Sequence, residues 1–122
     1  MVVEGRKEDL IKRGGEKISS EEVENLLLGH PQVQNVAGIA MPDPVLGERA
    51  CAYVVPRSGR PPTLPDLCEF LLQRQIARFK LPERLEVVDG FPLTSVGKVS
   101  KKALRDDIAR KLEAERAARR QS

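Results

Sequence analysis

Aromatic residues are scarce in this chain: they make up 3% of the sequence, and tryptophan is absent. Proteins that bind single-stranded nucleic acid stack the bases on aromatic side chains, so the chain offers few places for such contacts. The net charge of +3 is concentrated in residues 101–122, where eight Lys or Arg stand against four Asp or Glu. We therefore expect no nucleic-acid partner, and a solvated basic helix end is the simpler interpretation of the charge.

Cysteine and histidine are equally sparse. Cys51 and Cys68 both fall in apolar patterns, where a free cysteine behaves as a small hydrophobic residue, so we expect two buried thiols. No CxxC spacing occurs, and the single histidine, His30, has no second ligand candidate near it. These absences predict that the chain has no metal site.

The sequence also lacks any apolar run long enough to span a bilayer, and it has no signal-peptide pattern. Both absences predict a cytoplasmic protein without a membrane partner. A length of 122 residues, of which 40% are hydrophobic, suits one compact domain and is short for two independent cores.

Turn residues and apolar spacing predict an α+β domain, with a small sheet of about three strands flanked by helices and glycine-rich β-hairpins near both ends. Residues 10–12 and 17–19 are expected to pair around Gly14 and Gly15. Two longer strands are expected at 36–41 and 50–55, and a third at about 85–88.

Capping residues place the helices. Ser19, followed three residues later by Glu22, predicts a capping box and a helix that reaches about residue 29. Thr63 is the expected N-cap of a second helix, whose apolar stripe extends to Ile76. The apolar positions of a last helix are Ala103, Leu104, Ile108 and Leu112. This helix is expected to fray into a disordered basic tail at 113–122.

The segment PLTSVGKVSKK, residues 92–102, contains a Gly-Lys pair that invites comparison with a phosphate-binding P-loop. That motif requires a glycine separated by four residues from its Gly-Lys pair, and Ser or Thr directly after the lysine. This chain has Pro92 and Val99 at those places. The P-loop is therefore excluded. Two interpretations stay open: Gly97 allows a tight turn that presents Lys98 to an active site, or Lys98 is an ordinary surface lysine.

The segment GRKEDLIKRGGEKIS, residues 5–19, joins a charged cluster to a two-glycine hairpin. Such a segment suits a hinge followed by a backbone surface against which a narrow substrate can lie. Glycine pairs also occur in ordinary hairpins, so these residues alone do not decide between the two.

Taken in order, four segments make the sequence resemble the C-terminal domain of the adenylate-forming ligases, the superfamily of acyl-CoA synthetases, nonribosomal peptide adenylation domains and luciferases. The resemblance runs from Gly5 to about Arg105 and rests on GRKEDLIKRGGEKISSEEVE, HPQVQNVAGIAMPDPVLGERACAYVVP, ARFKLP and PLTSVGKVSKKALR. RGGEKIS, FKLP and GKVSKKALR look most like the stand-alone aryl-acid AMP ligases, which activate 2,3-dihydroxybenzoate or salicylate for siderophores.

The resemblance implies a role for each matching residue. Lys98 would be the catalytic lysine that enters the active site while the carboxylate and ATP form acyl-adenylate and pyrophosphate. Arg6 would contact the ribose of the nucleotide. Glu8 would be the hinge, within a hinge region near 6–9, although the family usually has Asp or Lys there. The hairpin of Arg13, Gly14 and Gly15 would line the tunnel for the pantetheine thiol.

The resemblance also implies partners. Residues 1–112 would be a mobile lid domain, and ATP and Mg²⁺ would be bound mainly by an N-terminal domain of the same enzyme, so this chain by itself is expected to be inactive. Met1 is expected to be a start placed just before the hinge. The thiol would come from an aryl carrier protein or from coenzyme A. The context of Lys98 also resembles that of lysines which acetyltransferases modify, and acetylation would remove its charge.

Two other interpretations remain open from the sequence. The chain could belong to a fatty-acyl or other acyl-CoA ligase, because such enzymes share many of these sequence motifs. It could also be a free-standing interaction module whose basic tail docks an acidic carrier protein.

Overall fold

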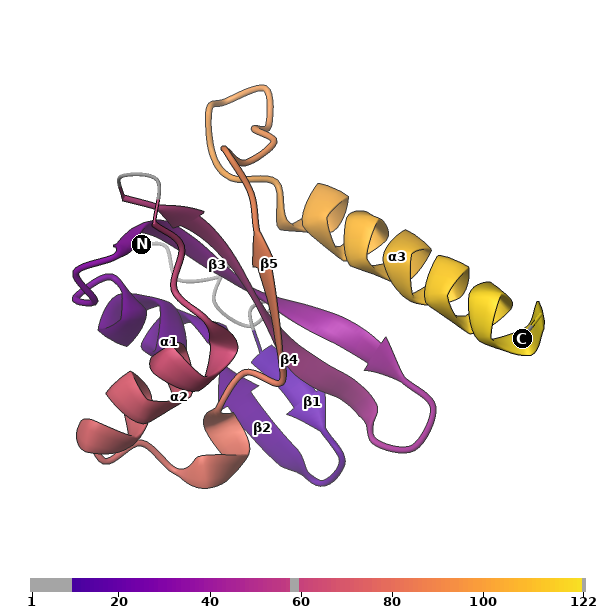
Figure 1. Ribbon diagram of the computed structural model, residues 1–122, viewed down its shortest axis with the longest axis horizontal. Coiled ribbons are helices and arrows are strands. Elements are labelled where there is room, and N and C mark those ends of the chain that lie inside the picture. Colours follow the sequence, from indigo (N-terminus) through magenta and orange to yellow (C-terminus); the bar gives the residue numbers. More distant parts are fainter. Residues whose placement is uncertain (1–9, 58–59, 122) are drawn as a thin grey trace. The chain divides into compact units, whose positions relative to one another are not determined.

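The computed structural model describes residues 10–57 and 60–121. They divide into two compact units, one ending at Gly90 and one beginning at Phe91. The first unit holds a five-stranded sheet, two α-helices and the short 3-10 helix η2 (Arg78–Lys80), and the second holds a hairpin turn and a long helix (Figure 1). The predicted α+β class is confirmed.

The sheet has a mixed topology. Its strands are β1 (Leu10–Arg13), β2 (Glu16–Ser19), β3 (Val33–Asp43), β4 (Gly47–Pro56) and β5 (Arg84–Val87). β4 pairs antiparallel with β3 along its whole length, and on its other edge it pairs antiparallel with β1 at Gly47 and parallel with β5 over Cys51–Val54. The sheet therefore has more strands than the expected three, because the N-terminal hairpin joins it through Arg13, which pairs with Gly47.

Two helices pack on one face of this sheet: α1 (Ser20–Leu27) and α2 (Leu64–Gln73), seen beside the sheet in Figure 1. Their apolar residues and alternate residues of the strands form the core, because successive side chains of a strand point to opposite faces. The core members are Ile11, Ile18, Val23, Leu27, Val33, Val36, Ala50, Ala52, Val54, Leu67, Leu71 and Ile76.

The helix starts agree with the predictions and refine them. The Ser19 hydroxyl accepts a hydrogen bond of 3.2 Å from the N–H of Glu22, as an N-cap should. The Glu22 carboxylate lies 2.9 Å from the ammonium of Lys80, and the full reciprocal box occurs at the second helix, between Thr63 and Asp66. The Asp66 pKa is lowered, chiefly because its carboxylate accepts the N–H of Thr63.

The end of α2 differs from the prediction. The apolar stripe extends to Ile76, but the helix ends at Gln73, because Gln75 adopts a left-handed φ of 62°. Gln75 N donates to the carbonyl of Leu72, and Ile76 N donates to that of Leu71. This is the Schellman arrangement, in which the apolar residue after the left-handed position folds back onto the last turn.

The second unit contains α3 (Lys101–Gln121). It begins where the apolar pattern predicts, and Leu104 and Ile108 are its buried residues. The structure differs from the expectation of a disordered tail, since the helix continues through residues 113–121. Alanine-rich sequence has high helix propensity, and local ion pairs such as Arg116 with Glu113, 3.5 Å apart, support it.

Within the described residues, α1 and α2 are too short to cross a bilayer and α3 is too rich in charge, so none of these helices is a candidate membrane span.

Candidate functional site

The lysine singled out in the sequence lies beside a tight hairpin turn. Leu93 pairs antiparallel with Val99, Thr94 N donates to the carbonyl of Lys98 at 2.7 Å, and Gly97 N donates to that of Thr94 at 3.0 Å. Gly97 has a φ of 86°, a left-handed value that glycine tolerates best. A three-residue hairpin loop closes in this way, with a turn followed by a left-handed glycine.

The turn holds the backbone of Lys98 and leaves its side chain exposed. Lys98 N donates a second hydrogen bond to this loop's opening residue, the Thr94 hydroxyl, at 3.2 Å. Two apolar side chains nearby are also exposed, Leu93 at 63% and Val96 at 75%. The arrangement is therefore a fixed backbone that carries an exposed cation beside exposed apolar groups.

The glycine pair expected to line a narrow channel forms the turn between β1 and β2. Arg13 pairs with Glu16, so Gly14 and Gly15 are the two loop residues. Of the two, only Gly14 has a positive φ, 61°, as a type II′ turn requires. A Cβ on Gly14 would lie 3.3 Å from Leu46 Cδ2, whereas a Cβ on Gly15 would meet nothing within 4 Å. Gly15 thus leaves a bare stretch of backbone facing open space.

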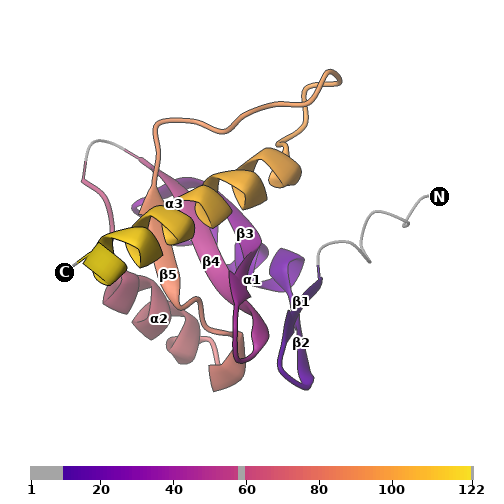
Figure 2. The ribbon, with the colours of Figure 1, turned by 90° about the vertical axis from the view of Figure 1, so that its right-hand side faces the viewer.

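This turn is attached to the neighbouring turn between β3 and β4, and both lie at the same end of the sheet (Figures 1 and 2). Gly14 N donates to the carbonyl of Leu46 at 2.8 Å. Lys12 N donates to Glu48 Oε1 at 2.7 Å. The position of the glycine turn therefore depends on residues 43–48.

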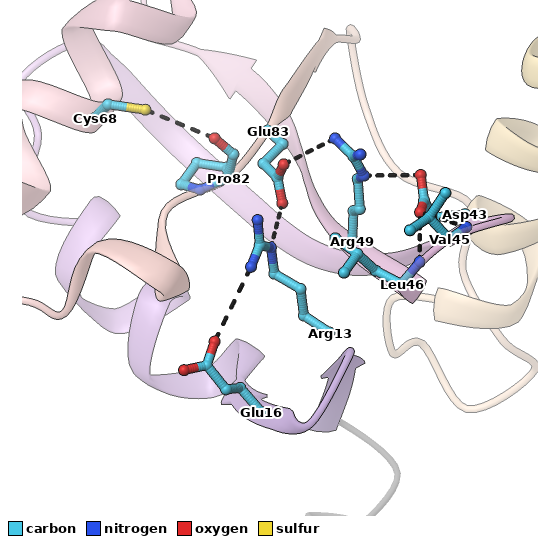
Figure 3. A network of polar contacts seen from close by, with 9 residues as sticks. All are labelled: Arg13, Glu16, Asp43, Val45, Leu46, Arg49, Cys68, Pro82 and Glu83. Carbon is cyan, nitrogen blue, oxygen red and sulfur yellow. Dashed lines mark hydrogen bonds and ion pairs between the residues drawn. The ribbon is translucent and has the colours of Figure 1, made fainter.

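Charged side chains strengthen the same attachment (Figure 3). Arg13 Nε donates to Glu83 Oε2 at 2.7 Å, and Arg49 Nη1 donates to Glu83 Oε1 at 3.0 Å. Arg49 Nε lies 2.8 Å from Asp43 Oδ1 as an ion pair, although this buried N–H makes no well-directed hydrogen bond. One carboxylate thus holds two guanidinium groups from different strands.

Contacts within this network shift the pKa values of Arg13 and Asp43. The Glu83 carboxylate, through its hydrogen bond and its charge, raises the pKa of Arg13 above the usual value. The N–H of Leu46 is the main cause of the lowered pKa of Asp43; burial opposes it, and the Val45 N–H and Arg49 add to it. Arg13 and Asp43 therefore both keep their charge near neutral pH.

The structure brings Arg13, Gly14 and Gly15 together at one turn, while Lys98 belongs to the other unit. Arg6 and Glu8 lie outside the described residues. Sequence reasoning missed Glu83, which follows the quoted FKLP, because its partner Arg13 is 70 residues away along the chain.

Two other features of the site region bear on the predictions. Cys51 is buried as expected, whereas Cys68 is only partly buried, and its thiol donates to the carbonyl of Pro82 at 3.6 Å. Burial raises the pKa of the Cys68 thiol, so this cysteine is a poor nucleophile. In residues 10–57 and 60–121, no group of three or more His, Cys, Asp or Glu could hold a metal ion.

Comparison with known proteins shows which family the chain belongs to. The family described as "AMP-binding enzyme C-terminal domain" matches residues 22–98. The chain belongs to this family, which places it among the adenylate-forming enzymes.

Similar proteins narrow the comparison. The chain is 54% identical over 112 residues to the 2,3-dihydroxybenzoate-AMP ligase of Bacillus subtilis, covering 92% of this chain and 21% of that protein. It is 56% identical over 108 residues to a salicylyl-CoA synthase / salicylate adenylyltransferase of a Streptomyces species, covering 88% and 20%. The apo structure of MbtA from Mycobacterium smegmatis superimposes with a TM-score of 0.77 at 43% identity, covering 80% and 18%. The chain thus spans about a fifth of the length of these relatives.

Proposed function

We propose that this chain is the C-terminal domain of an aryl-acid AMP ligase of siderophore biosynthesis. Two of its relatives at more than half identity carry 2,3-dihydroxybenzoate or salicylate in their names. The observation that carries the proposal is Lys98, an exposed cation on a hydrogen-bonded hairpin within a family of AMP-binding enzymes.

Lys98 would act in the first half-reaction, in which a carboxylate attacks the α-phosphate of ATP and pyrophosphate leaves. Both reactants are anions, so a positioned ammonium group stabilises the charge that gathers as they meet. The exposed Leu93 and Val96 beside it support insertion of the turn into another surface. An acetyltransferase that modified Lys98 would remove this charge and silence the step.

The hairpin of Gly14 and Gly15 would act in the second half-reaction, in which a thiol attacks the acyl carbon of the adenylate and AMP leaves. The bare backbone at Gly15 supports a role in lining a narrow channel for pantetheine. The thiol would come from an aryl carrier protein or from coenzyme A. ATP and Mg²⁺ would be held mainly by the N-terminal domain of the enzyme, with Arg6 at the ribose and Glu8 as the hinge.

The test separates the two half-reactions in the full-length enzyme. We expect Lys98→Ala to lower aryl-acid-dependent ATP/pyrophosphate exchange by roughly 100- to 1000-fold, the usual cost of losing one positioned electrostatic contact. Thioester formation from preformed acyl-adenylate should stay near the wild-type rate. The matched control is Lys102→Ala, since Lys102 is a second exposed lysine and pairs with Asp106 one turn away on its own helix.

Equal losses in the two half-reactions, or an equal effect of Lys102→Ala, would contradict the role of Lys98. The same exchange assay run with 2,3-dihydroxybenzoate, salicylate and a medium-chain fatty acid tests the substrate class. Faster exchange with the fatty acid would replace the aryl-acid proposal by the fatty-acyl one.

A further inference from the structure

The polar contacts around Glu83 form a closed ring that includes the glycine turn. From Gly14 the ring passes through the backbone to Arg13, then to Glu83 and Arg49 by hydrogen bonds of 2.7 and 3.0 Å. We call this ring of contacts, closed through Asp43 and Leu46, the charge clamp.

The second half of the charge clamp returns to the turn. Arg49 pairs with Asp43 Oδ1 at 2.8 Å, and Asp43 Oδ2 accepts the N–H of Leu46 at 2.7 Å. The carbonyl of Leu46 then accepts the N–H of Gly14 at 2.8 Å. Each link fixes the next, so the glycine turn has one preferred position against residues 43–46.

Glu83 is the link that joins the turn to the centre of the sheet. Its own N–H donates to the carbonyl of Ala50 in β4 at 2.8 Å, so its backbone is anchored. Its side chain is 25% exposed and that of Arg13 is 28% exposed, which keeps the pair partly shielded from solvent. Charge-assisted hydrogen bonds of this kind are among the stronger ones in proteins and set geometry as well as energy.

The arginine of the turn is occupied by this contact. Because the Arg13 guanidinium is bonded to Glu83 and lies 4.0 Å from Glu16, it is turned to the domain's own carboxylates. What the turn presents outward is the backbone at Gly15, where a Cβ would meet no atom within 4 Å.

We propose that Glu83 is a positioning residue for thiol transfer: through Arg13 and the charge clamp it fixes the Gly14–Gly15 turn as the backbone wall of the pantetheine channel. This inference rests on the proposed function and assigns Arg13 an indirect role in it. The ligand class is the phosphopantetheine arm of a carrier protein or of coenzyme A, a narrow chain whose thiol must reach the acyl carbon.

The experiment compares the half-reactions in the full-length enzyme. Glu83→Gln keeps the size of the side chain and removes the charge that holds both arginines. We expect it to lower kcat/KM for the thiol acceptor by roughly 10- to 100-fold, mainly through KM, as misplacement of a channel wall should. The rate of ATP/pyrophosphate exchange should stay within about twofold of wild type, because that step depends on Lys98 and not on the Gly14–Gly15 turn.

The matched control is Glu22→Gln, which removes a carboxylate from another long-range ion pair, with Lys80 at 2.9 Å, outside the charge clamp. Arg49→Met is the second variant: it interrupts the ring at another link and keeps Glu83, so it gives an answer if Glu83→Gln folds poorly. Both clamp variants should change thiol KM in the same direction. The inference would be overturned if Glu83→Gln and Arg49→Met behaved like Glu22→Gln. It would also be overturned if they slowed both half-reactions equally.

A third variant distinguishes this failure from failure of the proposed function. Gly15→Leu places a side chain where the domain itself has open space, so it should obstruct the channel without strain in the turn. Unchanged thioester formation by Gly15→Leu would show that the turn lines no thiol path, and the proposed function of the hairpin would fall with it. Impaired Gly15→Leu together with normal clamp variants would overturn only the role of Glu83.

Discussion

Gly97 decides whether the lysine turn can keep its shape. Its φ of 86° is a conformation that costs other residues roughly 1–2 kcal/mol, and three hydrogen bonds close around it. Nothing within 4 Å would meet a Cβ there, so the cost of a side chain at this position is one of backbone conformation and not of space.

We therefore predict that Gly97→Ala lowers adenylation in the full-length enzyme by roughly 5- to 30-fold, the population change that 1–2 kcal/mol produces. ATP/pyrophosphate exchange measures it. Gly90→Ala is the matched control, because a Cβ on Gly90 also meets nothing within 4 Å and Gly90 has no positive φ. Comparable rates for Gly97→Ala and Gly90→Ala would show that the left-handed turn does not matter for the step.

The candidate site residues that the sequence revealed are those whose local structure is set by their neighbours in the chain. Gly97 and Lys98 are adjacent, and the glycine pair stands in its own hairpin, so turn rules predict both. Glu83 and Arg49 escaped prediction because their role depends on contacts across the fold, which neighbouring residues do not encode. Roles carried by the family resemblance, those of Arg6 and Glu8 included, stay predictions.

At the scale of elements, the starts of helices were more predictable than their ends. Ser19 and Thr63 are N-caps, and their side chains accept the hydrogen bonds that their type predicts. The predicted end of α2 was wrong by a few residues, because Gln75 takes the left-handed position that glycine usually fills. Ile76 fits the apolar stripe of the helix, but it is buried by the turn that folds back.

This end of α2 predicts a stabilising substitution. Gln75→Gly should raise the free energy of unfolding by roughly 0.5–1 kcal/mol, because relief of the left-handed strain is partly offset by the greater entropy of glycine in the unfolded chain. Urea unfolding of the chain followed by circular dichroism measures it.

Gln73→Gly is the control for this prediction. Gln73 is exposed and is the last residue of the helix, so glycine there should destabilise by up to about 1 kcal/mol. The same replacement thus has opposite signs two positions apart. A loss of stability in both variants would mean that Gln75 is not strained.

At the scale of the whole molecule, the basic residues near the C-terminus are part of a helix. Arg116 pairs with Glu113, and Lys111 lies 2.9 Å from Asp107, so local partners compensate much of the charge. The end of α3 that the sequence suggested to be disordered is a regular extension of a helix whose buried residues, Leu104 and Ile108, lie nearer its start.

We predict that removing residues 113–122 leaves the melting temperature of the chain within about 4 °C, since the described side chains there are largely exposed and such changes cost about 0.5 kcal/mol or less. Thermal unfolding by circular dichroism measures it. Truncation before Leu104, which also removes the buried Ile108, is the contrasting variant and should lower the melting temperature clearly. A large drop on removing 113–122 alone would assign the helix end a structural role.

Because the space beside Gly15 is open, selection for folding and selection for thioester synthesis should act differently on positions 14 and 15. A library of all residues at position 14, screened only for folding, should be dominated by glycine, because the turn imposes a left-handed φ of 61° and Leu46 stands close. The same screen at position 15 should accept many residues, since this domain sets no limit there. If a screen for thioester synthesis then restores glycine at position 15, the restriction originates in the partner surface and the passing ligand, and the difference between the two libraries maps the channel one residue at a time.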